Sequence, residues 1–538
     1  MSILISLIKD IFASKPSAEK LSAVKNIDVL LKQKNLLDEK VIRFRQILTT
    51  NPNHVDALYN LGLSILEHEP EEAIKSFKKV VLLEPKHYAA KLSLLNEMLN
   101  QCNWTSKQAH TIRELRNALR QTTPSPHNIM SPFKLLSLPG VTAEEQKLCA
   151  KRWCQAFVPA ITIQQFKFSK PPKQKIRLAY LSGDFHQHAV AFQIAEIFER
   201  HDRNRFHISA YSYGPDDGSR MRKRLVKSFD NFCDIRDDTD DVAAKKIFND
   251  HIDILVDLTG HTGSSRSMIL ARRPAPIQVN YLGYAGTMGG SFVDYLIADQ
   301  FIIPQDQQQN YTEKVIWLPD SYMPNDNTRT CLAAPSRQGC GLPENAFVFC
   351  CFNQSYKITP EIFDIWCSLL KDVPDSVLWL PAGLPQTESN LKQEASNRGV
   401  GAERIIMAAK LPKIESHLAR LQCADLFLDT LPYNAHATCN DALWMGLPVV
   451  TCAGQTFPSR VAGSLLTAIG LPELVTYNLD DYYRLALDLA TDRNKLDAIR
   501  KKLIANRSTA PLFDSQRFTR NLELAYLQMM TDYIDSKV

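Results

Sequence analysis

Residues suited to holding a phosphate stand at the start of a predicted helix near Ala437. His436, Ala437 and Thr438 would place a ring nitrogen, backbone N–H groups and a hydroxyl at that helix N-terminus. Free N–H groups and the helix dipole both favour an anion there. Asp441, one turn further on, would repel a phosphate and suits a ribose hydroxyl better. The alternative is that Thr438 or Asn434 only caps the helix, while His436 packs in the loop.

Further polar residues follow other predicted strands. Gln354 and Lys357 come after one strand, and Lys357 is a candidate counter-charge for a diphosphate. The plain alternative is a surface lysine. Lys413, His417 and Arg420 come after another strand, with His417 and Arg420 near one face of a helix. Ligands of open parallel sheets bind at the carboxyl ends of the strands, so we expect these residues near one ligand.

The first half of the chain contributes histidines in similar places. His186 and His188 lie between a predicted strand and helix, and His261 and Thr262 lie at another strand end. A lone histidine is usually structural, but these three together with His417 would face one cleft, which indicates a functional site. We expect His186, His261 and Thr262 on the first-domain side of it.

Apolar strands that alternate with helices predict a parallel sheet with both faces covered. The pattern begins at Ile176, is interrupted by a linker-like segment at 333–345, and then starts again. The fold class is therefore α/β, with two facing Rossmann-like domains. The expected strands lie within 176–185, 206–213, 252–260, 277–286, 294–301 and 314–319, and then within 347–354, 376–383, 404–410, 426–430 and 448–454.

The beginning of the chain has a different character, because it is helical throughout. Ala73, Phe77, Val80 and Pro85 have the spacing of the second helix of a tetratricopeptide repeat, and Phe44 is in phase with them. A plain helical bundle is the alternative. The predicted domains are a tetratricopeptide-like region (1–120), a helical linker region (121–172), an N-terminal Rossmann-like lobe (173–335) and a C-terminal Rossmann-like lobe (336–538).

Composition restricts the class of protein. A chain of 538 residues is too long for one core, and its 45% apolar and 22% charged residues are typical of a soluble globular protein. A net charge of +5 without a dense basic tract gives no sign of nucleic-acid binding. The cysteines show no CxxC spacing, so we expect reduced thiols and a cytoplasmic protein. We expect no signal peptide and no membrane span.

From about residue 100 onward the chain resembles the nucleocytoplasmic protein O-GlcNAc transferases and their bacterial relatives. The helical N-terminus fits, because family members carry tetratricopeptide repeats. The resemblance implies a metal-independent, inverting glycosyltransferase of the GT-B type that needs no cofactor, with UDP mainly on the C-terminal lobe. The stretches that carry it are CNW at 102, SGDFHQH, RPAPIQVNYLGYAGT, FNQSYKITP, SVLWL, ADLFLDTLPYNAHATCNDALW and SRVAGSLL.

The resemblance also implies roles for single residues. Lys357 matches the catalytic lysine, Tyr356 the tyrosine beside it, and His188 a histidine proposed as base near the acceptor. The contacts to the donor diphosphate are matched by Gln354, Lys357, His436 and Thr438. His417 matches the residue that packs on the uridine, and Arg420 matches an arginine near it. The contacts to the ribose are matched by Lys413 and Asp441.

Catalysis by such a site would need no metal. Negative charge develops on the β-phosphate as the bond to the sugar breaks, and Lys357, His436 and the helix N–H groups would be aimed at that charge. The Asp-x-Asp string at Asp238–Asp240 precedes a predicted helix and is interpreted as an acidic helix start.

Two positions depart from the family pattern and leave the donor sugar open. Ala437 stands where the animal enzymes have a threonine, and Tyr433 where they have a cysteine near the N-acetyl group. A phenol there would fill the acyl space and favour a sugar without it. Plant-type O-fucosyltransferases share the Pro-Tyr pair, but they lack the histidine and aspartate that are His436 and Asp441 here, which favours a UDP-sugar over GDP-fucose.

Three hypotheses follow. The first is transfer of GlcNAc from UDP-GlcNAc to Ser or Thr of a polypeptide. The second keeps the fold but uses another UDP-sugar, such as UDP-glucose. The third is a repeat scaffold whose transferase domain is non-catalytic. The sequence leaves open the acceptor protein, the identity of the general base and an oligomer formed through the helical region. We expect His186, His261 and Thr262 on the acceptor or sugar side of the cleft.

Overall fold

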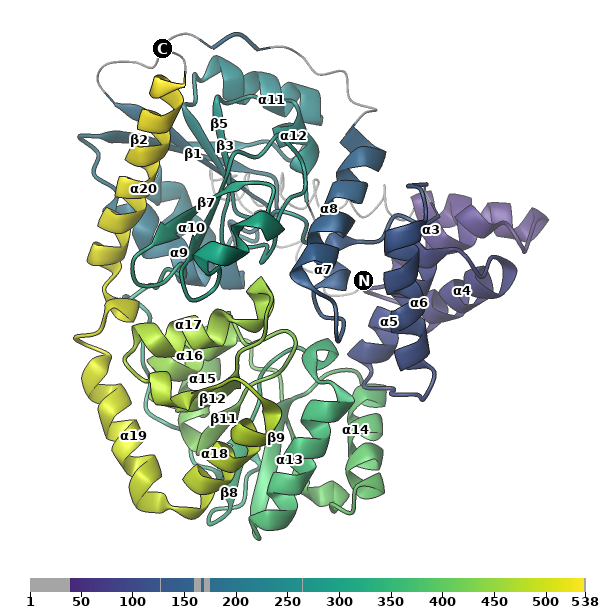
Figure 1. The fold of residues 1–538 in the computed structure, drawn as a ribbon, viewed down its shortest axis with the longest axis vertical. Coiled ribbons are helices and arrows are strands. Elements are labelled where there is room, and N and C mark those ends of the chain that lie inside the picture. The colour runs from purple at the N-terminus through teal and green to yellow at the C-terminus, as the bar shows by residue number, and fades with distance from the viewer. Residues whose placement is uncertain (1–38, 126, 159–165, 169–174, 264, 537–538) are drawn as a thin grey trace, which may run out of the picture.

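The computed structural model describes residues 39–125, 127–158, 166–168, 175–263 and 265–536. Two α/β lobes lie one above the other in Figure 1, and a set of helices from the N-terminal part of the chain lies beside them. The predicted fold class, two α/β domains preceded by helices, is confirmed. The helical expectation for residues 1–38 lies outside the described residues.

The first lobe is built on a seven-stranded parallel sheet with the order β3-β2-β1-β4-β5-β6-β7. Its central strands are buried on both faces, as their apolar sequences predict. The edge strand β3 was missed, because its four residues are only partly covered and show no apolar run. The strands are β1 (Ile176–Ser182), β2 (Phe206–Ser212), β3 (Asn231–Asp234), β4 (Ile254–Asp257), β5 (Ile277–Asn280), β6 (Tyr295–Asp299) and β7 (Lys314–Leu318), and the helices are α9 (Ala189–Arg200), α10 (Arg220–Ser228), α11 (Asp240–Asn249) and α12 (Ser267–Ala271).

The second lobe repeats this plan with a six-stranded parallel sheet of order β10-β9-β8-β11-β12-β13. Sequence analysis located every strand of it except β13, which has two residues. The strands are β8 (Phe347–Cys350), β9 (Ser376–Pro381), β10 (Ile405–Ala408), β11 (Leu426–Leu428), β12 (Val449–Cys452) and β13 (Val475–Thr476), and the helices are α13 (Pro360–Asp372), α14 (Pro385–Asn397), α15 (Ile414–Arg420), α16 (Ala437–Trp444), α17 (Val461–Ala468), α18 (Leu479–Thr491) and α19 (Arg493–Asn506).

The last helix, α20 (Ser515–Asp535), follows the second lobe in the chain but packs on the first one. Its Glu523 accepts a hydrogen bond from the backbone N–H of Asp202 at 2.8 Å, and its Asp532 pairs with Lys314 at 2.6 Å. The predicted C-terminal lobe of 336–538 therefore describes the order along the chain, whereas α20 ties the two lobes together (Figure 1).

The N-terminal helices form antiparallel pairs, as the repeat pattern predicts. The Cβ of any larger residue at Gly62 would lie 2.6 Å from the ring of Phe77, so glycine is required where the two helices of a pair meet. Ala73, Phe77 and Val80 are fully buried in these contacts. The helical elements are residues 39–50, α3 (Val55–Ile65), α4 (Pro70–Leu83), α5 (Tyr88–Asn100), α6 (Gln108–Gln121), α7 (Pro132–Leu135) and α8 (Ala143–Phe157).

Candidate active site

The phosphate-suited residues are gathered where α16 begins. The helix starts at Ala437, as predicted, and His436 occupies the position before it. The first N–H groups of an α-helix have no acceptor within the helix, so this end of α16 offers donors to an anion. The geometry therefore fits a phosphate at the helix N-terminus.

Lys357 reaches the same place from another strand end. It lies in the 3-10 turn Ser355–Lys357, called η4, between β8 and α13. Its side chain is buried, its Nζ donates to the carbonyl oxygen of Asn434 at 3.0 Å, and it stands 4.0 Å from the ring centroid of Tyr433. Burial lowers the pKa of Lys357 to about 8, and the nearby carboxylate of Asp429 opposes this shift. The solvated surface lysine considered from the sequence is thus not what the structure shows.

Asp429, which sequence analysis did not select, organises the loop between β11 and α16. Its carboxylate accepts from the backbone N–H groups of Thr430 at 2.7 Å and Ala435 at 2.6 Å, and from the hydroxyl of Thr451 at 2.6 Å. Burial raises the pKa of Asp429 to about 6. An acid directly after a predicted buried strand was the available signal. Asp429 holds the loop whose carbonyl, from Asn434, receives Lys357.

His436 and Thr438 already have partners within the protein. The Nε2 of His436 lies 3.2 Å from the carbonyl oxygen of Pro458, so it carries a proton and donates to that oxygen. Burial, together with the charge of Lys357, lowers the pKa of His436 well below its usual range, and the ring is neutral. The hydroxyl of Thr438 donates to the side-chain oxygen of Asn353 at 2.5 Å. Asn353 is a second residue of the site that was not selected from the sequence.

Tyr433 lies between the lobes. Its ring centroid is 4.8 Å from that of His436 and 6.4 Å from that of Tyr356, which it meets edge to face. The side chain is buried in an apolar cluster with Tyr284 and Met288 of the first lobe. It therefore occupies the space beside the phosphate-suited helix end.

A pocket of about 360 Å³ lies beside β10. Trp379 and Arg420 line it, together with residues of the linker between the lobes. The guanidinium of Arg420 donates to the carbonyl oxygen of Ala409 and to the Nδ1 of His417, at 2.5 and 2.7 Å, and its plane is held by these bonds. Burial and Arg420 lower the pKa of His417 to about 4, so the imidazole is neutral.

Two of the expected donor contacts are exposed side chains. Gln354 stands just before η4, and Lys413 just before α15. Neither makes a side-chain cap at its helix.

Asp441 is paired with Arg329, which lies in the irregular segment between β7 and β8 and was not selected from the sequence. Their closest atoms, Oδ1 and Nη1, are 2.6 Å apart, and both side chains are largely buried. Burial raises the pKa of Asp441, and Arg329 opposes this shift. Next to this pair, Asn440 of α16 donates to Gln193 of α9. The region behind the helix start is thus a junction between the lobes.

That junction brings the first-lobe histidines near the second lobe. His188 precedes α9, as His436 precedes α16, and the two helices contact each other. The Nδ1 of His188 accepts from the backbone N–H of Val190 at 3.3 Å and lies 3.6 Å from Asp184. His188 is half exposed, and the ring centroid of His186 is 5.7 Å away.

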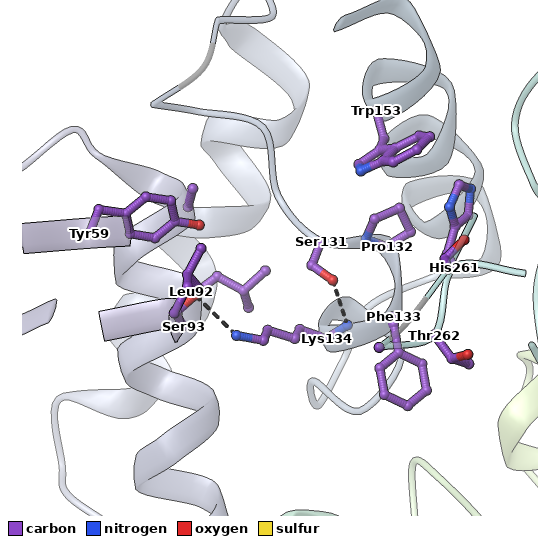
Figure 2. Close-up of a pocket in the computed structure, with 14 residues that line it drawn as sticks. Tyr59, Leu92, Ser93, Ser131, Pro132, Phe133, Lys134, Trp153, His261 and Thr262 are labelled. Atoms are coloured by element: carbon purple, nitrogen blue, oxygen red, sulfur yellow. Dashed lines mark hydrogen bonds between the residues drawn. The ribbon is translucent and has the colours of Figure 1, made fainter. Parts of the chain in front are cut away.

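His261 and Thr262 line a second pocket, of about 380 Å³, which lies between the N-terminal helices and the first lobe (Figure 2). His261 is buried against Trp153, and its Nε2 donates to the carbonyl oxygen of Met288 at 2.9 Å. Burial lowers the pKa of His261 to about 4. It is therefore a neutral residue of the pocket wall, and it contacts Tyr284 and Met288, which belong to the same buried cluster as Tyr433. Lys134 enters the pocket from α7 and donates to Ser93 at 3.1 Å.

The acidic string before α11 is engaged in ion pairs. Asp238 pairs with Lys246 at 2.6 Å and Asp240 with Arg266 at 2.8 Å, and α11 begins at Asp240, as the interpretation of a helix start predicts. Within the described ranges, no group of three or more His, Cys, Asp or Glu side chains is arranged to hold a metal. In the same ranges, every helix is too short or too polar to cross a bilayer.

Comparison with known proteins connects this geometry to a family. The family model described as glycosyl transferase family 41 matches residues 106–332 and 324–522. A solved structure of a mutant O-GlcNAc transferase from Thermobaculum terrenum is 28% identical, has a TM-score of 0.78, and is aligned over 97% of this chain and 100% of its own.

Curated relatives are longer. A probable UDP-N-acetylglucosamine–peptide N-acetylglucosaminyltransferase, SEC, from Arabidopsis thaliana is 38% identical over 363 residues, which are 66% of this chain and 37% of the relative. A UDP-N-acetylglucosamine–peptide N-acetylglucosaminyltransferase from Caenorhabditis elegans is 28% identical over 521 residues, which cover 76% of this chain and 45% of the relative. The chain thus spans less than half the length of these two proteins.

Proposed function

The chain belongs to glycosyl transferase family 41, and from this premise we propose that it transfers a sugar from a UDP-sugar to Ser or Thr of a polypeptide. UDP-GlcNAc is the first candidate, because the similar proteins from Arabidopsis and Caenorhabditis are named for it. The observation that carries the proposal is the buried ammonium of Lys357 beside the N-terminus of α16. A buried cation at the donor end of a helix is suited to a diphosphate.

We propose that UDP lies across the second lobe. The base would enter the pocket at Arg420, whose fixed guanidinium and neighbouring Trp379 suit a heterocycle. The ribose would lie near Asp441, and the diphosphate at the start of α16. We propose that His417 in α15, Lys413 just before that helix and Gln354 just before η4 make the remaining contacts to UDP.

The proposed reaction is a single inverting displacement. The acceptor oxygen attacks C1 of the sugar, the bond from C1 to the β-phosphate oxygen breaks, and its electron pair stays on UDP. Lys357 and the α16 N–H groups stabilise the oxygen where this charge grows, which lowers the barrier more than it tightens donor binding. We propose that these groups supply the positive charge without a metal.

Three side chains have narrower proposed roles than the sequence suggested. His436 is neutral and donates to Pro458, so it shapes the helix start and adds no positive charge. Thr438 would have to turn its hydroxyl from Asn353 to reach a phosphate. Tyr356 would support Tyr433 and Lys357 by packing.

We propose that the acceptor polypeptide approaches through the pocket between the N-terminal helices and the first lobe. Its walls combine apolar and polar side chains from both parts, including Phe133, Trp153, His261 and Thr262 (Figure 2). His188, half exposed before α9, would take or relay the acceptor proton together with Asp184. His186 lies beside it as a further acceptor-side residue.

The choice of donor sugar depends on Tyr433, which is buried beside Lys357. If its ring fills the acyl space, Tyr433→Cys raises the ratio of kcat/KM for UDP-GlcNAc to that for UDP-glucose, by about tenfold or more for a steric effect of this size. Tyr433→Phe keeps the ring and serves as the control, with the ratio unchanged. A flat ratio in the cysteine variant would show that the pocket is already open to the N-acetyl group.

Intact mass of the acceptor tests the function itself. A Ser- and Thr-rich unstructured polypeptide is incubated with the full chain, EDTA and one UDP-sugar at a time. We expect a mass increment that names the sugar and does not need a divalent metal. UDP binding with no transfer from any UDP-sugar would favour the alternative of a non-catalytic scaffold, and activity lost on chelation would refute the metal-independent mechanism.

A cytoplasmic location is proposed from the thiols. All twelve cysteines are free in the structure, and most are buried. This agrees with a reducing compartment.

A further inference from the structure

The turn that carries Lys357 is held by the N-terminal helices as well as by its own lobe. The hydroxyl of Ser355, in η4, donates to the carbonyl oxygen of Asn100 at 2.6 Å. In the opposite direction, the thiol of Cys102 donates to the carbonyl oxygen of Ser355 at 3.7 Å. Asn100 is the last residue of α5, and Asn100–Trp104 is called the docking turn below.

The docking turn has a defined shape and its own anchor on the second lobe. Cys102 is fully buried and has a φ of 47°, a left-handed conformation that non-glycine residues adopt only where contacts hold them. The ring of Trp104 packs on that of Phe363 in α13, with centroids 5.2 Å apart. The docking turn is therefore a fixed part of the interface with the second lobe.

Tyr356 connects the two parts from the other side. Its side chain packs against the apolar cluster of the N-terminal helices, which includes Leu99 and Leu115, while its ring edge meets Tyr433. Ser355, Tyr356 and Lys357 are consecutive. Two of them contact the helices, and the third carries the ammonium.

We propose that the docking turn is a positioning element for Lys357, so that the N-terminal helices set the rate of sugar transfer in addition to any contact with the acceptor. This inference rests on the proposed function. Electrostatic stabilisation requires the ammonium to be in place before charge develops, and a displacement of about 1 Å at a reacting centre can cost on the order of 10² in rate. A bond to η4, two residues from Lys357, restricts such a displacement.

If these contacts only stabilised the interface, loss of either of two hydroxyls from it would affect transfer equally. The chain offers a matched control for this alternative. The hydroxyl of Thr387, in α14, donates to the same carbonyl oxygen of Asn100 at 3.1 Å. Thr387 is buried and does not belong to η4. Ser355→Ala and Thr387→Val therefore each remove one hydroxyl from the same acceptor atom, but only the first loosens the turn with Lys357. Ser355→Thr keeps a hydroxyl.

The test measures single-turnover transfer at saturating donor, the Kd of UDP, and amide hydrogen exchange of residues 354–358 in the full chain. We expect Ser355→Ala to slow transfer by about tenfold or more, with a Kd within about twofold of the unmodified protein and faster exchange in the turn. Thr387→Val should leave the rate and the exchange of this turn within about twofold, and Ser355→Thr should restore most of the rate.

Equal rates in Ser355→Ala and Thr387→Val, whether both fall or both stay normal, would overturn the inference. A loss of rate in Ser355→Ala that is explained entirely by weaker UDP binding would also overturn it. Failure of the proposed function is separate, because the unmodified chain would then transfer no sugar from any UDP-sugar.

Discussion

Lys357→Met is expected to nearly abolish sugar transfer and to leave much of the UDP affinity. The ammonium is buried and aimed from η4 at the start of α16, where negative charge would grow on the leaving UDP. Loss of one preorganised donor to such a charge costs on the order of 10²–10³ in rate. The intact donor carries less charge on that oxygen, so binding suffers less than turnover. Single-turnover transfer and calorimetric UDP affinity, measured on one preparation, provide the check.

Lys371→Met is the matched control, because it removes an exposed lysine in the last turn of α13. Its rate should stay close to that of the unmodified protein. A Lys357→Met variant with near-normal rate would mean that another group supplies the charge.

The same lysine predicts a pH dependence. Burial lowers the pKa of Lys357 to about 8, and the protonated form is the active one, so kcat/KM for the donor should fall as pH rises through about 8. This basic limb should be absent from the residual activity of Lys357→Met.

Asp441→Ala is expected to weaken UDP binding more than it slows transfer at saturating donor, because a ribose contact is much the same in the ground and transition states. It should also lower stability, since it leaves the buried Arg329 without its carboxylate. Removing one partner of a buried ion pair typically costs about 3–5 kcal/mol in the free energy of unfolding. Denaturant titration and UDP calorimetry measure the two effects.

Asp441→Asn separates the ribose contact from the ion pair, because the amide keeps an acceptor for a hydroxyl while the charge is lost. It should retain more UDP affinity than Asp441→Ala. Asp320, paired with Arg517 at the surface at 2.7 Å, is the comparison for stability: Asp320→Ala should cost less than about 1 kcal/mol. Unchanged UDP affinity together with a large fall in saturated turnover would contradict the ribose role of Asp441.

The elements and the main site were predictable because local patterns specify them. Strands such as β1 and β4 are apolar runs that end in polar residues, and the start of α16 at Ala437 follows from the change from polar loop to apolar helix. Lys357 could be selected because it stands at a strand end, where parallel sheets bind ligands. Each of these signals is contained in a short stretch of consecutive residues.

What the sequence did not reveal depends on contacts between distant segments. The sequence does not distinguish Asp429 from other acidic residues, because its role depends on hydrogen bonds from Ala435 and Thr451. Arg329 lies 112 residues before its partner Asp441, in the irregular segment between β7 and β8. The return of α20 to the first lobe depends on side chains such as Glu523, which meets Asp202 321 residues earlier.

The roles of His261 and His436 were also beyond the sequence. A histidine at a strand end has the same sequence signal whether it faces a ligand or a backbone carbonyl. In the structure each donates to a carbonyl oxygen, of Met288 and Pro458, and burial keeps both rings neutral. Protonation and orientation follow from such neighbours rather than from residue type.

A crystal structure of the full chain with UDP tests the proposed donor site most directly. We expect the diphosphate at the N-terminus of α16, with the β-phosphate within hydrogen-bonding distance of the Nζ of Lys357 and the base in the pocket beside Arg420. UDP bound elsewhere on the chain, or a diphosphate placed away from Lys357, would contradict it.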